Sequence, residues 1–231
     1  MDNGKAMAFP AVTYLDNVVK DLLKVRYFRQ TADWSVKNMA KMKLHTARTS
    51  IVSDKFKKTA ASLLTHHVTP QLLVGAGQEY DEFFEMQLFG LVEGYKHISA
   101  STFCLPECRL TLEGSEITAG LKVELLDGDD MRQKCAQMTK MSFAEFAQLA
   151  AEGGFVHVSA PGTLLVLPPG FLFMQAAKKT TQGLRWSFWD QERAGAVKSM
   201  LDAFFSAWPT LCNSNFAEIK KWVDAQQEDV D

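Results

Sequence analysis

Five histidines, four cysteines and several closely spaced carboxylates are the side chains of this sequence best suited to catalysis or metal binding. Cys104 and Cys108 form a C-x3-C pair, and no second pair completes the four ligands of a tetrahedral zinc site. Cys104 follows His97 closely enough to form a nucleophile–base pair, although a buried free thiol is the commoner role of cysteine. His66 and His67 fall at an expected helix end, where imidazoles interact favourably with exposed carbonyl groups.

Two glycine-rich segments and one acidic segment could also do chemistry, but each has a commoner structural role. Gly75-Ala76-Gly77 begins like a dinucleotide-binding fingerprint, but Tyr80 stands where the third glycine is required, so we expect a turn. The carboxylates of residues 79–85 could act as general acid and base, whereas most acidic clusters form solvated faces. The Asp-Gly-Asp-Asp turn at residues 127–130 lacks the distal glutamate of a calcium-binding EF-hand loop.

The composition is that of a globular domain large enough for a substantial core. The chain has 231 residues, of which 47% are hydrophobic and 23% charged. No apolar run approaches the roughly 20 residues of a membrane-spanning helix, and the N-terminus does not resemble a signal peptide. We therefore expect an intracellular protein that does not enter a membrane, in a compartment that the sequence leaves open.

Charge is unevenly distributed along the chain. Residues 1–70 carry 12 Lys and Arg against 5 Asp and Glu, whereas residues 71–231 have a net charge of −9. A basic segment can attract nucleic acid or an acidic protein surface, and it can equally form solvated helix faces or pack beside acidic parts of its own chain. The candidate partner-binding residues are Lys20, Lys24, Lys41, Lys55, Lys57 and Lys58.

The hydrophobic periodicity predicts helices at both ends of the chain and strands between them. Ser142 and Glu145 have the spacing of a capping box at the start of one helix. The apolar stripe of the helix near residues 197–208 is wide enough to suit a subunit interface. Helices are expected at 13–28, 35–45, 53–66, 142–152, 197–208 and from 215, and strands at 83–91, 97–103, 109–112, 117–126, 155–158, 163–167, 171–175 and 184–189.

The segment Ala160–Phe173 (APGTLLVLPPGFLF) resembles the second motif of the cupin superfamily, and is most similar to its jumonji-type oxygenases. The pattern G-x5-P-x-G-x2-H is met by Gly162, Pro168 and Gly170, and Phe173 stands at the histidine position. The following segment Trp186-Ser187-Phe188-Trp189 is similar to the next core strand of that family. The resemblance implies an α+β fold, with a cupin-like double-stranded β-helix near residues 71–190 flanked by N-terminal and C-terminal helices.

The first cupin motif can be laid on Gly94, Glu107 and Gly114, which places Ala100 and Thr102 at its two histidine positions. Such oxygenases hold Fe(II) with two histidines and a carboxylate, and bind 2-oxoglutarate beside the metal. None of the five histidines here has an Asp or Glu two residues later, and phenylalanine offers no metal ligand. The resemblance therefore implies a cupin-like domain that has lost its metal site and needs no cofactor.

We expect one compact unit made of a basic helical region, 1–70, and a cupin-like β domain with closing helices, 71–231. The first functional hypothesis is a non-catalytic binding or assembly protein that acts through a protein partner or a second copy of itself. The second is an atypical oxygenase, which would require His97, Glu107 and His157 to converge. The third is a nucleic-acid-associated protein acting through the basic N-terminal helices.

Overall fold

The computed structural model describes residues 11–24, 46–49, 62–66, 68, 70–73, 86–100, 104–122, 131–207 and 214–228. The strands are β1 (Ala11–Tyr14), β2 (Thr46–Thr49), β3 (Gln87–Leu91), β4 (Lys96–Ala100), β5 (Glu107–Lys122), β6 (Gly154–Ser159), β7 (Thr163–Leu167) and β8 (Phe171–Ser187). The helices are α1 (Asp16–Lys24), α5 (Met131–Lys140), α6 (Phe143–Gly153), α7 (Ala194–Ala207) and α8 (Ser214–Glu228). Two short 3-10 helices span Pro70–Leu73 and Gln191–Arg193.

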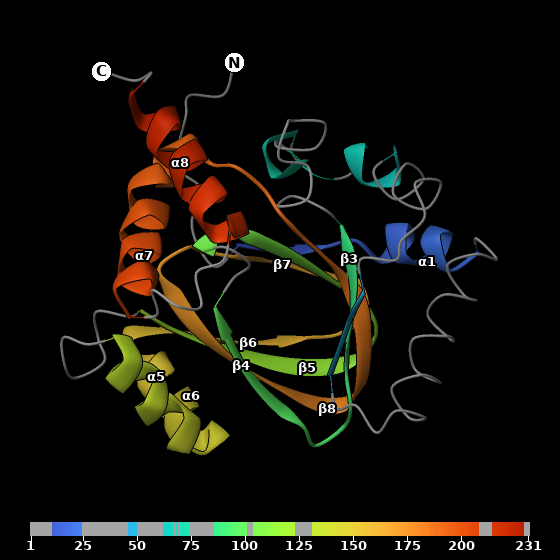
Figure 1. Ribbon diagram of the computed structural model, residues 1–231. Coiled ribbons are helices and arrows are strands. Elements are labelled where there is room, and N and C mark those ends of the chain that lie inside the picture. Colours follow the sequence, from blue (N-terminus) through green and yellow to red (C-terminus); the bar gives the residue numbers. More distant parts are fainter. Residues whose placement is uncertain are drawn as a thin grey trace.

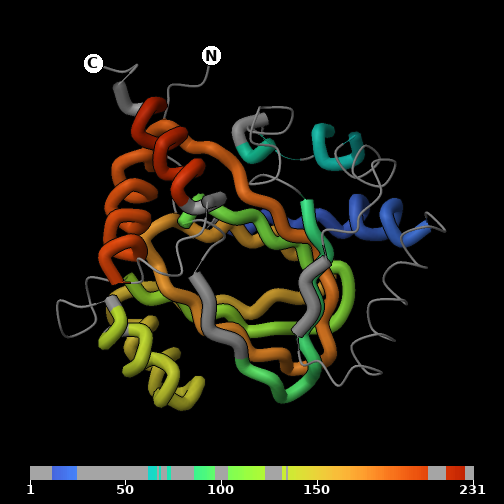
Figure 2. Tube along the Cα trace, viewed as in Figure 1, coloured from blue at the N-terminus to red at the C-terminus, as the bar shows by residue number. Residues whose placement is uncertain are grey.

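The described strands form one antiparallel sheet built on β5 and β8, which pair along nearly their whole lengths. At one end this strand pair is flanked by β7 and β3, and at the other end by β6 and β4. Register shifts between Thr111 and Glu116 mark bulges where the flanking strands change, and bulges bend and twist a strand pair. The strands therefore curve around a common interior (Figures 1 and 2), in an open arrangement consistent with a β-sandwich.

Helices cover the outer side of this curved sheet at two places. One apolar core packs Val18 and Leu22 of α1 against β5, β7 and β8 through residues such as Leu110 and Trp186. The indole Nε1 of Trp186 also donates a hydrogen bond of 2.8 Å to the carbonyl of Leu72. A second apolar core packs α5, α6, α7 and α8 against the other half of β5 and β8 (Figure 1).

The structure confirms several predicted elements. Helix α6 begins with the capping box of Ser142 and Glu145, in which both reciprocal hydrogen bonds are present. Helix α7 buries Val197 and Leu201, as its apolar periodicity predicted. Within the described part of the chain, no helix combines the length and the apolar character needed to cross a membrane.

Other predictions were wrong in their boundaries or their type. Residues 11–14 form strand β1 and pair with β7, so the predicted helix 13–28 begins only at Asp16. Strand β2 adds a second strand to the stretch 1–70, which was predicted to be helical. Two predicted strands, 109–112 and 117–126, are parts of the single long strand β5. In the same way, the predicted strands 171–175 and 184–189 are parts of β8. Helix α5 was not predicted. The predicted helix 35–45 lies outside the described residues.

Candidate binding site

The interior of the curved sheet is lined by polar side chains at one end and aromatic side chains at the other. In β5, Cys108 and Leu110 pack outward with α1, so the alternate residues Glu107 and Arg109 face the interior. In the second half of the strand, Ala119 packs outward against the helices, and the neighbouring positions therefore face inward. Residues paired across antiparallel strands share a face, so the strand registers identify the interior side chains of β6 and β8.

Four buried charges and one amide form an interior charge cluster, which consists of Gln87, Glu107, Arg109, Glu116 and Arg185. The Glu107 carboxylate lies 3.6 Å from Nη1 of Arg109 and 3.4 Å from Nη1 of Arg185. Nη2 of Arg109 lies 3.3 Å from Oε2 of Glu116, and Arg185 donates two hydrogen bonds to Oε1 of Gln87 at 2.7 and 3.1 Å. Arg109 and Arg185 are cross-strand neighbours, and the Glu107 carboxylate between them offsets their repulsion.

Burial changes the proton affinity of this cluster. The pKa of Glu116 is raised by loss of solvent, and Glu107 raises it further, while Arg109 acts in the opposite direction. Burial also lowers the pKa of Arg185, although Glu107 partly offsets this effect. The cluster contains two arginines and two glutamates, and the raised pKa of Glu116 reduces the negative charge that offsets the arginines. Its environment is therefore suited to an anionic or oxygen-rich group.

Next to the charge cluster lies a polar row, which consists of Thr118 on β5, His157 on β6 and Gln175 on β8. The registers pair Thr118 with both His157 and Gln175, so the three residues come from adjacent strands and share one face. Oγ1 of Thr118, Nε2 of His157 and Nε2 of Gln175 are buried atoms without a hydrogen-bond partner in the described structure. Burial lowers the pKa of His157, which favours its neutral form.

Neighbouring interior positions also carry buried polar atoms without a hydrogen-bond partner in the described structure. Ser159, which is paired with Glu116, and Thr111 also bury hydroxyl oxygens that have no partner among the described residues. Nε of Arg109 is a further buried donor without an acceptor among the described residues. Buried polar groups in native proteins are nearly always satisfied by protein, water or ligand. Several interior side chains can therefore still form hydrogen bonds with water or a ligand.

The expected position of the cupin histidine lies in an aromatic cluster made of Phe155, Phe171 and Phe173. Phe173 is 1% exposed, and its ring centroid lies 6.1 Å from that of Phe155 and 6.3 Å from that of Phe171. Gly120 makes room for this cluster, because a Cβ atom there would collide with the Phe155 ring. The three rings offer no metal ligand, and the sequence offers none at Ala100 or Thr102. These residues do not fit the iron site that the resemblance would imply.

The strand registers give the positions of the three catalytic candidates along the sheet. The register places His97 opposite Gln175, at the far side of the polar row from His157, with strands β8 and β5 between them. Three strand spacings of about 4.8 Å correspond to roughly 14 Å along the sheet. Glu107 lies at the other end of β5, where two arginines bind it. Among the described residues, no three His, Cys, Asp or Glu side chains gather in a metal-binding group.

The lysine candidates are only partly described. Lys20 and Lys24 are exposed on α1, and Nζ of Lys24 lies 2.8 Å from Oδ1 of Asp21. Lys41, Lys55, Lys57 and Lys58 lie outside the described residues, as do residues 75–80 and the turn 127–130.

Sequence reasoning named Glu107 and His157 as catalytic candidates, but it missed the other interior polar residues. Glu107, Arg109 and Thr111 alternate with apolar residues in β5, and this alternation is usually that of a strand with one solvated face. Arg185 and Ser187 of β8 are paired with Arg109 and Glu107 and share their face. Two segments, 107–111 and 184–188, alternate polar and apolar residues, and each contains an arginine. The site could have been predicted if the polar faces of both segments had been assigned to the same buried interior.

Comparisons with known proteins assign no family to the chain. No described protein family matches it, and no curated protein matches it. A solved structure with a partly similar arrangement is that of YcfD, a ribosomal oxygenase from Escherichia coli. It is 12% identical, the match covers 58% of this chain and 31% of that chain, and the TM-score is 0.31. The match spans less than a third of the YcfD chain, and a likeness of this size assigns neither a fold nor an activity.

Proposed function

We propose that this protein is a non-catalytic binding protein with a cupin-like sheet, which holds a small oxygen-rich molecule in the sheet interior. The observation that carries the proposal is the polar row. Thr118, His157 and Gln175 come from three adjacent strands and direct buried polar atoms without partners toward the same side. Unsatisfied atoms that share a row on three strands have the arrangement of a binding site.

The energetic cost of these atoms supports the same conclusion. A buried donor or acceptor without a partner costs about 1–3 kcal/mol, and a whole domain is stable by only about 5–15 kcal/mol. Several such atoms in one interior are therefore expensive unless something satisfies them. Nε of Arg109 and Nε2 of Gln175 are donors, and the hydroxyls of Thr118 and Ser159 can donate, so the complementary ligand is rich in acceptor oxygens.

The chemistry of the interior favours binding over turnover. Phe173 occupies the position at which the resembling oxygenases carry a metal-binding histidine. The carboxylate of Glu107 is already held in ion pairs with Arg109 and Arg185. Burial and the neighbouring Glu107 raise the pKa of the Cys108 thiol, which packs outward in the apolar core. These groups suit a rigid polar lining for a ligand.

A pair of threonine substitutions tests the proposal. Thr118→Val removes a buried hydroxyl that has no partner in the described structure, so the ligand-free protein should become more stable by about 1 kcal/mol or more. Thr163→Val is the matched control, because Oγ1 of Thr163 accepts a hydrogen bond of 3.2 Å from the amide of Ala160. The control should lose about 1 kcal/mol. Urea unfolding at 25 °C measures both differences.

The same variants separate binding from stability. Citrate, glucose and 2-oxoglutarate are suitable oxygen-rich probes, and a probe that binds the interior should raise the melting temperature of the unaltered protein. Thr118→Val should reduce that rise, whereas Thr163→Val should preserve it. If Thr118→Val loses as much stability as Thr163→Val, the interior hydroxyl is already satisfied and the proposal is wrong.

A further inference from the structure

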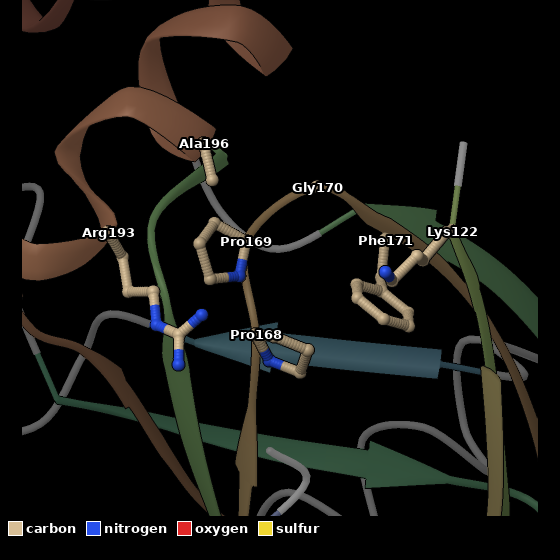
Figure 3. Close-up of a pocket in the computed structure, with 7 residues that line it drawn as sticks. All are labelled: Lys122, Pro168, Pro169, Gly170, Phe171, Arg193 and Ala196. Atoms are coloured by element: carbon tan, nitrogen blue, oxygen red, sulfur yellow. The ribbon is translucent and has the colours of Figure 1, made fainter. Parts of the chain in front are cut away.

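A second concave site lies outside the polar row, where the turn between β7 and β8 meets the start of α7. It is a pocket of about 360 Å³, within the range of small-molecule sites. Its walls include the turn Pro168–Gly170, Phe171 and the two cations Lys122 and Arg193. Figure 3 shows Arg193 on one side of the two prolines, and Lys122 with Phe171 on the other.

The aromatic cluster separates this pocket from the polar row. Phe171, Phe173 and Gln175 are alternate residues of β8, so they follow one another along the same face of the strand. Phe171 is half-buried and lines the pocket, Phe173 is fully buried behind it, and Gln175 lies beyond Phe173 in the polar row. A molecule in the pocket therefore contacts different side chains from a molecule in the interior.

The charge of the pocket is of one sign. Both charged side chains among its described lining residues are cations, Lys122 on β5 and Arg193 in the 3-10 helix before α7. Arg193 also contacts Asp190, whose Oδ2 lies 4.0 Å from its Nε and which is not among the described lining residues. Ala196 belongs to the first turn of the 14-residue helix α7, where the helix dipole adds positive potential.

The apolar part of the lining is rigid and flat. Two consecutive prolines restrict the backbone of the turn, and Gly170 has a φ of +78°, a conformation that favours glycine. Phe171 stacks on Phe173 with an angle of 9° between the ring planes, which holds its ring in place. A fixed apolar wall beside two cations fits a molecule with a flat apolar body and an acidic group.

We propose that this pocket binds a small organic anion in which a phosphate or carboxylate is joined to a flat apolar group. The acidic group contacts Arg193, and the apolar group extends over the two prolines toward Phe171, where Lys122 adds positive potential. Guanidinium groups bind phosphate and carboxylate through paired, charge-assisted hydrogen bonds, which gives Arg193 the larger share of the affinity. This site is independent of the ligand proposed for the sheet interior.

Phenyl phosphate, benzoate, inorganic phosphate and phenol are the probes that test this proposal, with binding followed by isothermal titration calorimetry at low salt. Phenyl phosphate or benzoate should bind saturably at millimolar concentration, more tightly than inorganic phosphate or phenol alone. If phenyl phosphate binds more tightly than benzoate, the ligand carries a phosphate, and the reverse order indicates a carboxylate. Affinity should fall as salt is added, because Lys122 and Arg193 are partly exposed.

Charge-neutralising variants locate the binding. Arg193→Gln should weaken phenyl phosphate or benzoate binding by about tenfold or more, the range of a lost charge-assisted hydrogen bond. Lys122→Gln should weaken it less, and Phe171→Leu should reduce the advantage over inorganic phosphate. The matched control is Lys179→Gln, which removes the same charge from an exposed position eight residues along β8 from Phe171.

Three outcomes would overturn the proposal. The first is no saturable binding of any probe. The second is an equal loss of affinity in Arg193→Gln and Lys179→Gln, which would indicate attraction to net charge alone. The third is equal affinity for inorganic phosphate and phenyl phosphate, with benzoate no tighter than either. Thr118→Val should leave binding of these probes unchanged, so a failure of the interior site is distinguished from a failure of this pocket.

Discussion

Replacement of Arg109 by methionine should destabilise the protein severely at neutral pH, because it leaves a buried carboxylate without a cation. Arg109 is 4% exposed, and its Nη2 lies 3.3 Å from Oε2 of Glu116. Glu107 would keep the contact of 3.4 Å to Arg185, whereas Arg109 is the one ion-pair partner of Glu116 within the described part of the chain. The substitution therefore isolates the charge of Glu116.

The size of the effect follows from that geometry. Two unit charges at this separation interact by about 5 kcal/mol at an effective dielectric constant near 20. Measured losses on breaking buried ion pairs are about 3–5 kcal/mol, so we expect Arg109→Met to cost about 4 kcal/mol at pH 7. The guanidinium also lies 4.1 Å from the centre of the Phe89 ring, and loss of that contact adds to the cost.

Urea unfolding followed by tryptophan fluorescence, at pH 7 and pH 5, measures this loss. The double variant Arg109→Met with Glu116→Gln should regain about 2 kcal/mol over Arg109→Met alone, because the isolated charge is removed. The cost of Arg109→Met should also be smaller at pH 5, where Glu116 takes up a proton more readily. Lys179→Met is the surface control, because Lys179 is exposed, and it should change stability by less than about 0.5 kcal/mol. A loss below about 1 kcal/mol, or a double variant no more stable than the single one, would refute the reasoning.

Three further predictions use the same unfolding assay. The folded-state pKa of Glu116 is raised, so its contribution to stability is present at low pH and is lost as pH rises through that pKa; Glu116→Gln should therefore gain on the unaltered protein as pH increases, and a constant difference would contradict this. Gly162→Ala should cost about 2 kcal/mol or more, because φ is +91° and the Asp16 carboxylate occupies the position of a Cβ. Ser142→Ala should cost about 1 kcal/mol through loss of the capping box, and an unchanged urea midpoint would show that the cap contributes nothing.

Local sequence signals predicted the elements whose physics is local. Ser142 and Glu145 are three residues apart and satisfy each other's backbone amide groups, so the start of α6 needs no tertiary contact to be recognised. Leu184, Trp186 and Phe188 alternate along the predicted strand 184–189, and all three lie in one apolar core. In both cases the determining residues lie within a few positions of each other.

Elements that depend on distant pairing were missed. Gly114 and its polar neighbours have the composition of a turn, but they form the bulged part of β5 opposite residues 179–182 of β8. Strand β1 has four residues and gains its hydrogen bonds from β7, about 150 residues later, while its apolar residues run on into the periodicity of α1. Neither feature has a signature within its own segment.

The candidate site was missed for a related reason. The alternation of β5 shows that Glu107, Arg109 and Thr111 share a face, but it does not say whether that face meets water or another strand. Whether that face is buried depends on the curvature of the sheet, which is set by the long pairing of β5 with β8. The cupin-like pattern around Gly162, Pro168 and Gly170 identified the turn, whereas the interior chemistry comes from residues outside that pattern.

The most direct test of the account is to incubate purified protein with Fe(II), ascorbate and 2-oxoglutarate, and to measure bound iron and the succinate formed. The account predicts no stoichiometric iron and no succinate above the protein-free control, because Phe173, packed in an aromatic cluster, stands where the resemblance would place a metal-binding histidine. Stoichiometric iron with succinate formation that is lost on substitution of His97 or His157 would contradict the account and establish an atypical oxygenase.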